Sequence, residues 1–172
     1  PVKNIFLTGA AVWQMQTSSN GPVGFTPAYQ KNSLTPNLFA GIQYSGTLFT
    51  AGGALDYKRI RPESRLMLSS MSAAAYAQYK EGLWCIKGKT VYGNNLADHI
   101  MPGGYGLYYN PSDNQFGYTS LTGSSSWVNI VYGKKWQVGA FAGLHQNLGS
   151  QLPMLYRNPA GQYTVYGRGF YK

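Results

Sequence analysis

Charged residues are scarce in this sequence of 172 residues, in which only 11% are Asp, Glu, Lys or Arg. A typical soluble domain carries roughly 25%, so the composition favours a protein whose outer surface does not face water. Cysteine is limited to Cys85, which excludes an intrachain disulfide and leaves the redox compartment open. The sequence starts at Pro1 and shows no signal peptide, so we expect a mature, trimmed or partial chain.

Long apolar runs are also missing. No stretch approaches the roughly 18 to 20 apolar residues of a transmembrane helix. Strands remain possible as membrane spans, because a strand of a transmembrane barrel needs only about 9 to 11 residues of alternating polarity. The length predicts one domain over residues 1–172. Its 22 glycines and 15 tyrosines suit a β-protein with an apolar exterior, with a soluble, tyrosine-rich β-sandwich as the alternative.

Catalytic groups are few. The two histidines, His99 and His145, and the five acidic residues show no metal-ligand spacing. No G-x-S-x-G motif supports a nucleophilic triad. The glycines at 103–106 lack the strand-to-helix context of a phosphate loop. We therefore expect no enzyme, metal or cofactor.

The net charge of +9 raises the question of nucleic-acid binding. Such proteins concentrate Lys and Arg in a stripe or tract. Here the basic residues are scattered, and Lys58-Arg59 with Arg61 is the densest group. We therefore expect no nucleic-acid partner.

A β-hairpin with aromatic residues beside its turn is the repeated unit of the chain. Its clearest copy spans 126–144, where apolar residues alternate on both sides of a turn at 133–135. A period of two is the signature of a strand with two different faces. Two further copies have turns at 45–47 and 80–82. The aromatics that flank the three turns are Tyr44, Phe49, Tyr79, Trp84, Tyr132 and Trp136.

About eight strands follow from this alternation. We expect strands at about 4–16, 37–44, 48–58, 70–80, 84–93 and 162–170, and two in the 126–144 hairpin. Alanine at 73–75 and 77 would also suit a helix, but Met71, Tyr79 and the alanines at 73, 75 and 77 share one parity, which favours a strand. Long connections are expected at 17–36, 59–69, 94–123 and 147–161.

Two regularities predict an antiparallel transmembrane β-barrel. Long and short connections alternate, as in outer-membrane barrels, which have short periplasmic turns and long extracellular loops. Charged residues of the strands share one parity and avoid the face with the aliphatic and aromatic residues. They are Asp56, Lys58, Lys80, Lys87, Lys89 and Arg168. A soluble, ligand-binding barrel would invert this pattern.

The turn-flanking aromatics predict a girdle at one membrane surface, since Tyr and Trp favour such interfaces. Trp13, Tyr57 and Tyr92 lie near the opposite ends of their strands. The alternative, that these rings fill a soluble core, would place them at strand centres rather than beside turns.

The polar parity predicts the lining of a pore. Lys87 and Lys89 are two residues apart, so both point to the lumen, about 7 Å from each other, where they would attract anions. They could instead only solvate the wall or pair with Asp56. The predicted lining comprises Asp56, Lys58, Lys87, Lys89, Gln137, His145 and Arg168. A constriction by the 94–123 segment would use Tyr105, Tyr108 and Tyr109; an exposed loop or an oligomer contact is the alternative.

Several stretches resemble a known family. They are 3–11, 54–62 and 125–143, followed by Asn147-Leu148-Gly149. They resemble Gram-negative outer-membrane porins, most closely the DcaP-like trimeric porins. The resemblance implies a 16-stranded barrel in the outer membrane of a Gram-negative bacterium, in contact with lipid and lipopolysaccharide. It also implies a homotrimer that passes small, often anionic solutes.

The sequence departs from that family in supplying only about eight strands. Either it is part of a larger barrel that acts as a porin, or eight strands close on themselves and act structurally or in binding through their long loops. An eight-stranded barrel is filled by side chains. Small residues on the inner parity (Gly41, Gly52, Ala54, Ala74, Gly139 and Gly143) would fill it poorly, which favours the larger barrel. A soluble barrel that binds a small ligand is the third possibility.

Overall fold

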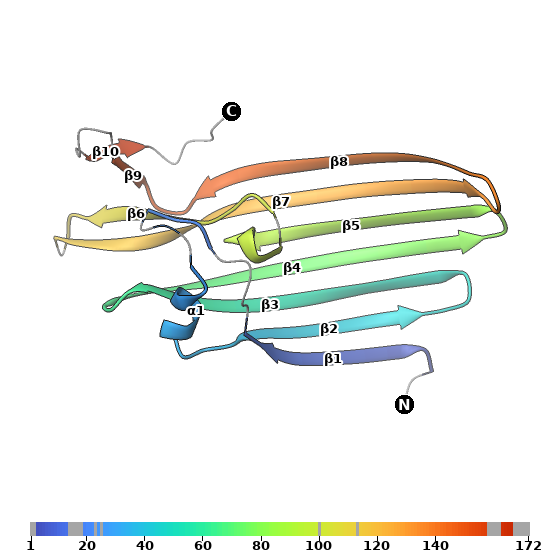
Figure 1. Cartoon of the computed structure of the whole chain (residues 1–172), viewed down its shortest axis with the longest axis horizontal. Coiled ribbons are helices and arrows are strands. Elements are labelled where there is room, and N and C mark those ends of the chain that lie inside the picture. The colour runs from blue at the N-terminus through green and yellow to red at the C-terminus, as the bar shows by residue number, and fades with distance from the viewer. Residues whose placement is uncertain are drawn as a thin grey trace.

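The chain folds into one curved antiparallel sheet (Figure 1). This computed structural model describes residues 3–13, 19–22, 24, 26–99, 101–112, 114–157 and 163–166. The longer strands are β1 (Ile5–Val12), β2 (Asn37–Ser45), β3 (Phe49–Glu63), β4 (Leu66–Glu81), β5 (Trp84–Asn94), β7 (Gln115–Gly133) and β8 (Gln137–Ser150). The short elements are α1 (Ala28–Asn32), η1 (Leu96–His99), β6 (Tyr105–Asn110), β9 (Met154–Arg157) and β10 (Tyr163–Tyr166). Among the described residues, no helix is both long and apolar enough to cross a membrane.

Strands that lie side by side in the sheet are mostly consecutive in the sequence. The order is β1-β2-β3-β4-β5-β7, with β8 paired to the outer side of β7 and with β6, β9 and β10 joined at one end. The three predicted short turns, β2–β3, β4–β5 and β7–β8, lie together at the opposite end (Figure 1). The 126–144 hairpin is confirmed, and Gly133 adopts a positive φ of 124° at its turn. The alanine-rich segment is a strand, as its parity predicts.

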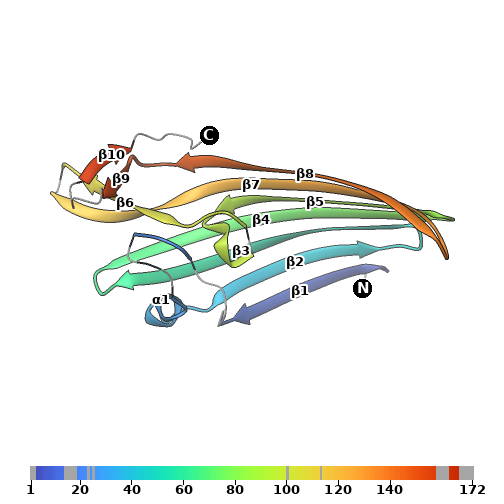
Figure 2. The same ribbon diagram turned by 45° about the horizontal axis from the view of Figure 1, so that its top comes forward.

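The sheet is open rather than closed into a barrel. In the described part of the chain, β1 pairs with β2 and β8 pairs with β7, and their outer edges do not meet. Figure 2 shows the same open sheet from a second angle. Of the predicted strand at 162–170, residues 163–166 form β10, which pairs with β9 instead of extending the row of long strands. Residues 162 and 167–170 lie outside the described residues. Closure of eight strands on themselves is therefore not what this structure shows.

Two predicted loops are wrong, because strands continue through them. The 59–69 connection is a hairpin in which Ile60 faces Leu68, and only residues 64–65 form the turn. Pro62 lies where the β3–β4 register shifts, a position that tolerates its missing amide donor. In the 94–123 segment, β6 pairs with the first part of β7, up to the pair Asn110 and Gln115. β8 likewise runs to Ser150, past the expected start of a loop.

A small core holds these extensions together at the end of the sheet away from the short turns, which we call the far end. Its buried members are Ile60, Leu68, Tyr105 and Tyr118, with Tyr29, Leu66 and Leu107 packed against them. The rings of Tyr105 and Tyr118 meet edge to face, with centroids 5.2 Å apart. The core joins β3, β4, β6 and β7 with α1, so the far end is a compact structure rather than a set of loops.

Candidate functional site

The strand register gives the sheet two chemically different faces. We call the face with the parity of Asp56, Ser72 and Lys89 the polar face, and the opposite one, with Ile42, Leu55 and Ile86, the apolar face. Asp56 faces Ser72 across β3 and β4, as the shared parity of the strand charges predicts. Lys87 and Lys89 lie two residues apart on β5 and are exposed. Opposite these two lysines lie Gln78, Tyr76, Asn129 and Trp127.

Open depressions follow one another along the polar face. Lining the first, near the short turns, are Lys80, Cys85, Lys87, Asn129, Lys134 and Gln137. Lining the second are Tyr76, Gln78, Lys87, Lys89 and Trp127. Lining the third, toward the far end, are Phe39, Asp56, Ser72, Tyr76, Lys89 and His99. Because Lys87 is shared by the first two and Lys89 by the last two, the depressions form one continuous polar track.

The track is basic over most of its length. Lys80 and Lys134 lie at the short-turn end, and Lys87 and Lys89 lie in the middle. Asp56 is the carboxylate among the described lining residues, and it lies at the far-end side. A groove lined by one sign of charge concentrates ions of the other sign. The track is therefore suited to anions.

Residues 95–99 lie beside the track at the far end, where His99 lines the third depression. They include η1, from which His99 Nε2 approaches the Ser72 hydroxyl at 3.3 Å and an Asp56 carboxylate oxygen at 3.9 Å. Leu96 of η1 is completely buried. The sequence interpretation assigned His99 only a polar role in a loop and did not foresee this contact. The available signal was Leu96, an apolar residue that directly follows two asparagines in a segment expected to be a loop.

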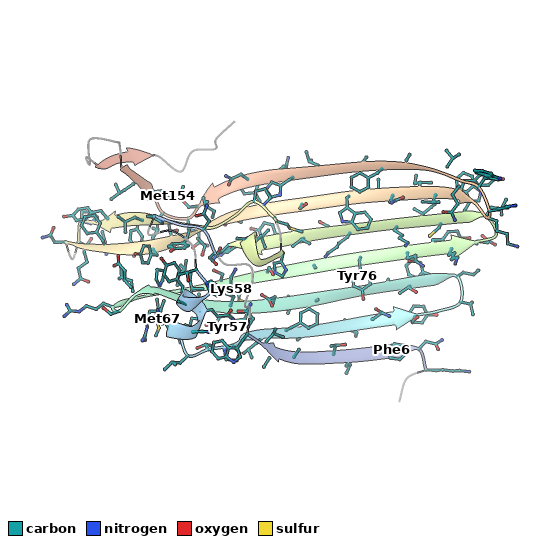
Figure 3. All side chains as sticks on the ribbon, in the orientation of Figure 1. Phe6, Tyr57, Lys58, Met67, Tyr76 and Met154 are labelled. Atoms are coloured by element: carbon teal, nitrogen blue, oxygen red, sulfur yellow. The ribbon has the colours of Figure 1, made fainter. Side chains whose placement is uncertain are left out.

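Lys58 has the predicted parity but not an open environment. Only 4% of it is exposed, and its ammonium group donates a hydrogen bond of 2.6 Å to the backbone carbonyl of Asn95. It lies near the far end, whereas Tyr76 lies within the body of the sheet (Figure 3). Lys58 therefore anchors the segment that carries η1.

The tyrosines predicted to form a constriction lie on β6, in the far-end structure. Tyr105 is buried in the small core, Tyr108 is half-buried, and Tyr109 packs against Phe116 with ring centroids 5.4 Å apart. Burial raises the pKa of the Tyr105 phenol above its ordinary value. The element that reaches over the track is η1 rather than these side chains.

Two more of the predicted lining residues, Gln137 and His145, lie on β8. Gln137 is exposed and lines the first depression. His145 faces Ser125 across β7 and is half-buried. Arg168 lies outside the described residues.

The apolar face is continuous across the long strands. Its cross-strand neighbours include Leu7 with Ile42, Leu55 with Ala73, and Ile86 with Ile130. These side chains are exposed: 79% of Leu7 and 77% of Val138 are accessible. On this parity no charged residue lies between Phe49 and Tyr57 of β3, between Met71 and Tyr79 of β4, or between Trp84 and Tyr92 of β5. The charged residue that follows on β4, Glu81, lies opposite Trp84 beside the short turn.

Aromatic residues border the apolar face at both ends. At the short turns, the exposed rings are Tyr44, Phe49, Tyr79, Trp84, Tyr132 and Trp136. Trp84 and Tyr132 are adjacent, with centroids 4.7 Å apart. Eight residue steps separate Trp84 from Tyr92 on β5, or about 27 Å along the strand. With the usual tilt of 35–45°, the separation across a bilayer would be about 20 Å, close to the apolar band of transmembrane barrels.

Sequence reasoning placed Phe141 on the inner side of the wall but did not foresee that rings on the polar face lie over glycines. The rings of Phe39 and Phe141 lie over Gly41 and Gly143, two residues further along the same strands. Their signal was an aromatic followed two residues later by glycine on the polar parity. This spacing was overlooked because the glycines were considered only as small residues that would fill a lumen poorly.

Comparison with known proteins provides no family for the chain: no family model, curated protein or solved structure matches it. The resemblance of 3–11, 54–62 and 125–143 to outer-membrane porins therefore stays a prediction. What the described chain offers to a function is a sheet with one polar and one apolar face.

Proposed function

We propose that this sheet is part of the wall of an outer-membrane porin in a Gram-negative bacterium. Its apolar face lies against lipid, and its polar face lines a basic, water-filled lumen through which small hydrophilic anions diffuse. The observation that carries the proposal is the pairing of an uncharged face between two aromatic borders with a basic track on the opposite face of the same strands.

Lipid explains the apolar face better than water does. Soluble monomers rarely expose contiguous apolar patches larger than a few hundred Å², whereas this face exposes aliphatic side chains from β1 to β8. Burying one such Leu or Ile contributes about 1.5–3 kcal/mol. The bilayer interior supplies that burial, and its interfaces suit the Tyr and Trp borders.

The unpaired outer edges of β1 and β8 would need partner strands in a complete membrane wall. A strand edge cannot face hydrocarbon, because each unsatisfied amide or carbonyl there costs several kcal/mol. The proposed barrel therefore contains further strands paired to the outer edges of β1 and β8. The 16-stranded, trimeric architecture implied by the resemblance would supply them and would leave the polar track facing water.

Bilayer recording tests the proposal. The protein is purified in detergent, confirmed as β-rich by circular dichroism, and added to a planar bilayer separating two KCl concentrations. We expect stepwise conductance increments and a reversal potential on the chloride-selective side. Heat-denatured protein is the control. Folded protein that inserts into lipid without conductance, or whose current is cation-selective, would refute a basic diffusion pore.

A further inference from the structure

Aromatic rings on the polar face lie close to glycines. A Cβ built on Gly143 would be 3.3 Å from two ring carbons of Phe141, and one built on Gly41 would be 3.2 and 3.3 Å from ring carbons of Phe39. A Cβ on Gly52 would overlap the ring of Tyr76, whose hydroxyl donates a hydrogen bond of 2.6 Å to the side-chain amide oxygen of Gln43. Glycine thus lets each ring lie along the wall, with its other face turned outward.

Two of the rings form one platform. Trp127 and Phe141 lie on adjacent strands, with centroids 6.0 Å apart and planes inclined by only 32°. Gly143 lies directly opposite Trp127 in the β7–β8 ladder and has no side chain that could come between the two rings. Phe141 is 66% exposed, so its ring face is not used to fill a core. An exposed aromatic platform on a polar wall is a surface on which an apolar ring face can stack.

Cationic and amide groups surround this platform. Lys89 faces Trp127, while Lys87 faces Asn129, which in turn faces Phe141. Gln78 lines the same depression as both lysines and Trp127. The lysines offer charge and donors, and the amides offer both donors and acceptors.

We propose that this platform, together with Lys87, Lys89, Asn129 and Gln78, is a binding station for a sugar ring that carries an acidic group. The C–H face of a pyranose stacks on Trp127 and Phe141, and its negative group meets the lysines. Its hydroxyls, which both donate and accept, match the amides. A planar aromatic acid would stack as well, but it has no hydroxyls to use the amide oxygens.

This station deepens the proposed function, on which its role in transport rests. It lies midway along the polar track, between the depression at the short turns and the one at η1. A permeation site must bind well enough to admit a solute and weakly enough to release it. An open wall with two rings and two lysines fits weak binding of that kind.

Ligand-observed NMR titration of the detergent-folded full chain tests the station. The probes are glucuronate, glucose (the same ring without the charge), gluconate (the charge without the ring) and benzoate. We expect glucuronate to bind most tightly. Because aromatic stacking of nucleic-acid bases contributes about 1–3 kcal/mol, Trp127→Leu or Phe141→Leu should weaken glucuronate binding by about fivefold or more. Phe39→Leu, which removes a ring seated away from Trp127, is the matched control.

The outcomes separate the possibilities. If gluconate binds as tightly as glucuronate, the platform is not a ring-binding site and the lysines only attract anions in general. If benzoate binds as tightly as glucuronate, the assignment to a sugar is wrong. Unchanged affinity in Trp127→Leu and Phe141→Leu would overturn the platform. Bilayer recordings run in parallel: an anion-selective channel without ring preference refutes the station alone. If the protein forms no channels in the bilayer, the porin proposal is refuted. The titration in detergent then still decides whether the station binds glucuronate.

Discussion

Lys58 and Asn95, which are 37 residues apart in sequence, are joined by a hydrogen bond of 2.6 Å from the buried ammonium group to the backbone carbonyl oxygen. Asn95 itself has a positive φ of 53°. Its amide side chain donates to the Ser19 hydroxyl at 2.8 Å, and its backbone N–H donates to the Leu121 carbonyl at 2.7 Å. One residue therefore ties the η1 segment to β3, β7 and the connection that follows β1.

Removing the Lys58 ammonium should loosen the η1 segment. Lys58→Met keeps much of the side-chain volume but withdraws this donor from a buried carbonyl, at a cost of about 1–3 kcal/mol. We expect faster hydrogen exchange of backbone amides in residues 95–104, measured by mass spectrometry. Lys31→Met, on the exposed face of α1, is the control. Unchanged exchange in Lys58→Met would show that the anchor lies elsewhere.

Lys87 and Lys89 should set the charge preference of the pore. Replacing both by Glu reverses the potential in the middle of the track, so the reversal potential should move toward cation selectivity, and more strongly at low ionic strength. Single variants allow a matched comparison: Lys87→Glu should shift the potential, whereas Arg65→Glu, in the β3–β4 turn, should shift it much less. An unchanged value for Lys87→Glu with Lys89→Glu would exclude these lysines from selectivity.

Adjacent alanines on β4 should respond oppositely to a charge. Ala75 lies on the apolar face midway between Met71 and Tyr79, and Ala74 lies on the polar face. A lysine at the bilayer midplane costs about 2–4 kcal/mol on the lipid face. Ala75→Lys should therefore lower the free energy of unfolding in vesicles by about that amount, and Ala74→Lys by clearly less. Denaturant titration measures both, and equal losses would contradict the assignment of the faces.

The far-end core should weaken at alkaline pH. Burial raises the pKa values of the Tyr105 and Tyr118 phenols, with a smaller contribution from Glu63 at Tyr118. An unfolded tyrosine loses its proton near pH 10, so the stabilisation is fully present below that pH and is lost as pH rises through the folded pKa values. Phenolate absorbance should report late ionisation that Tyr105→Phe diminishes. Ionisation of the folded protein complete by pH 10 would contradict this account.

Sequence pattern predicted the sheet where the strands are regular. Around the 133–135 turn, alternation alone gives the strands, the turn and the residues on each face, because the period of a strand is fixed by backbone geometry. The register then aligns Ile86 with Ile130 and Lys87 with Asn129 as that alternation requires.

Features that depend on distant contacts were not predictable in this way. Residues 59–69 resemble a loop by charge and Pro62, yet they pair because Ile60 and Leu68 meet Tyr105 and Tyr118 from other strands. The pairing of Trp127 with Phe141 depends on the β7–β8 register. Whether the sheet closes likewise depends on whether the outer edges of β1 and β8 meet. A local sequence pattern carries no information on that contact.

Accessibility of spin labels at residues 129 and 130 tests the central claim most directly, because these neighbours point to opposite faces of β7. Single cysteines, Asn129→Cys and Ile130→Cys, are placed in a Cys85→Ser background and labelled in lipid vesicles. We predict that the label at 130 collides with oxygen and is shielded from a water-soluble nickel complex, while the label at 129 shows the reverse. Equal access of the nickel complex to both labels would contradict a membrane wall with one face in lipid and one in water.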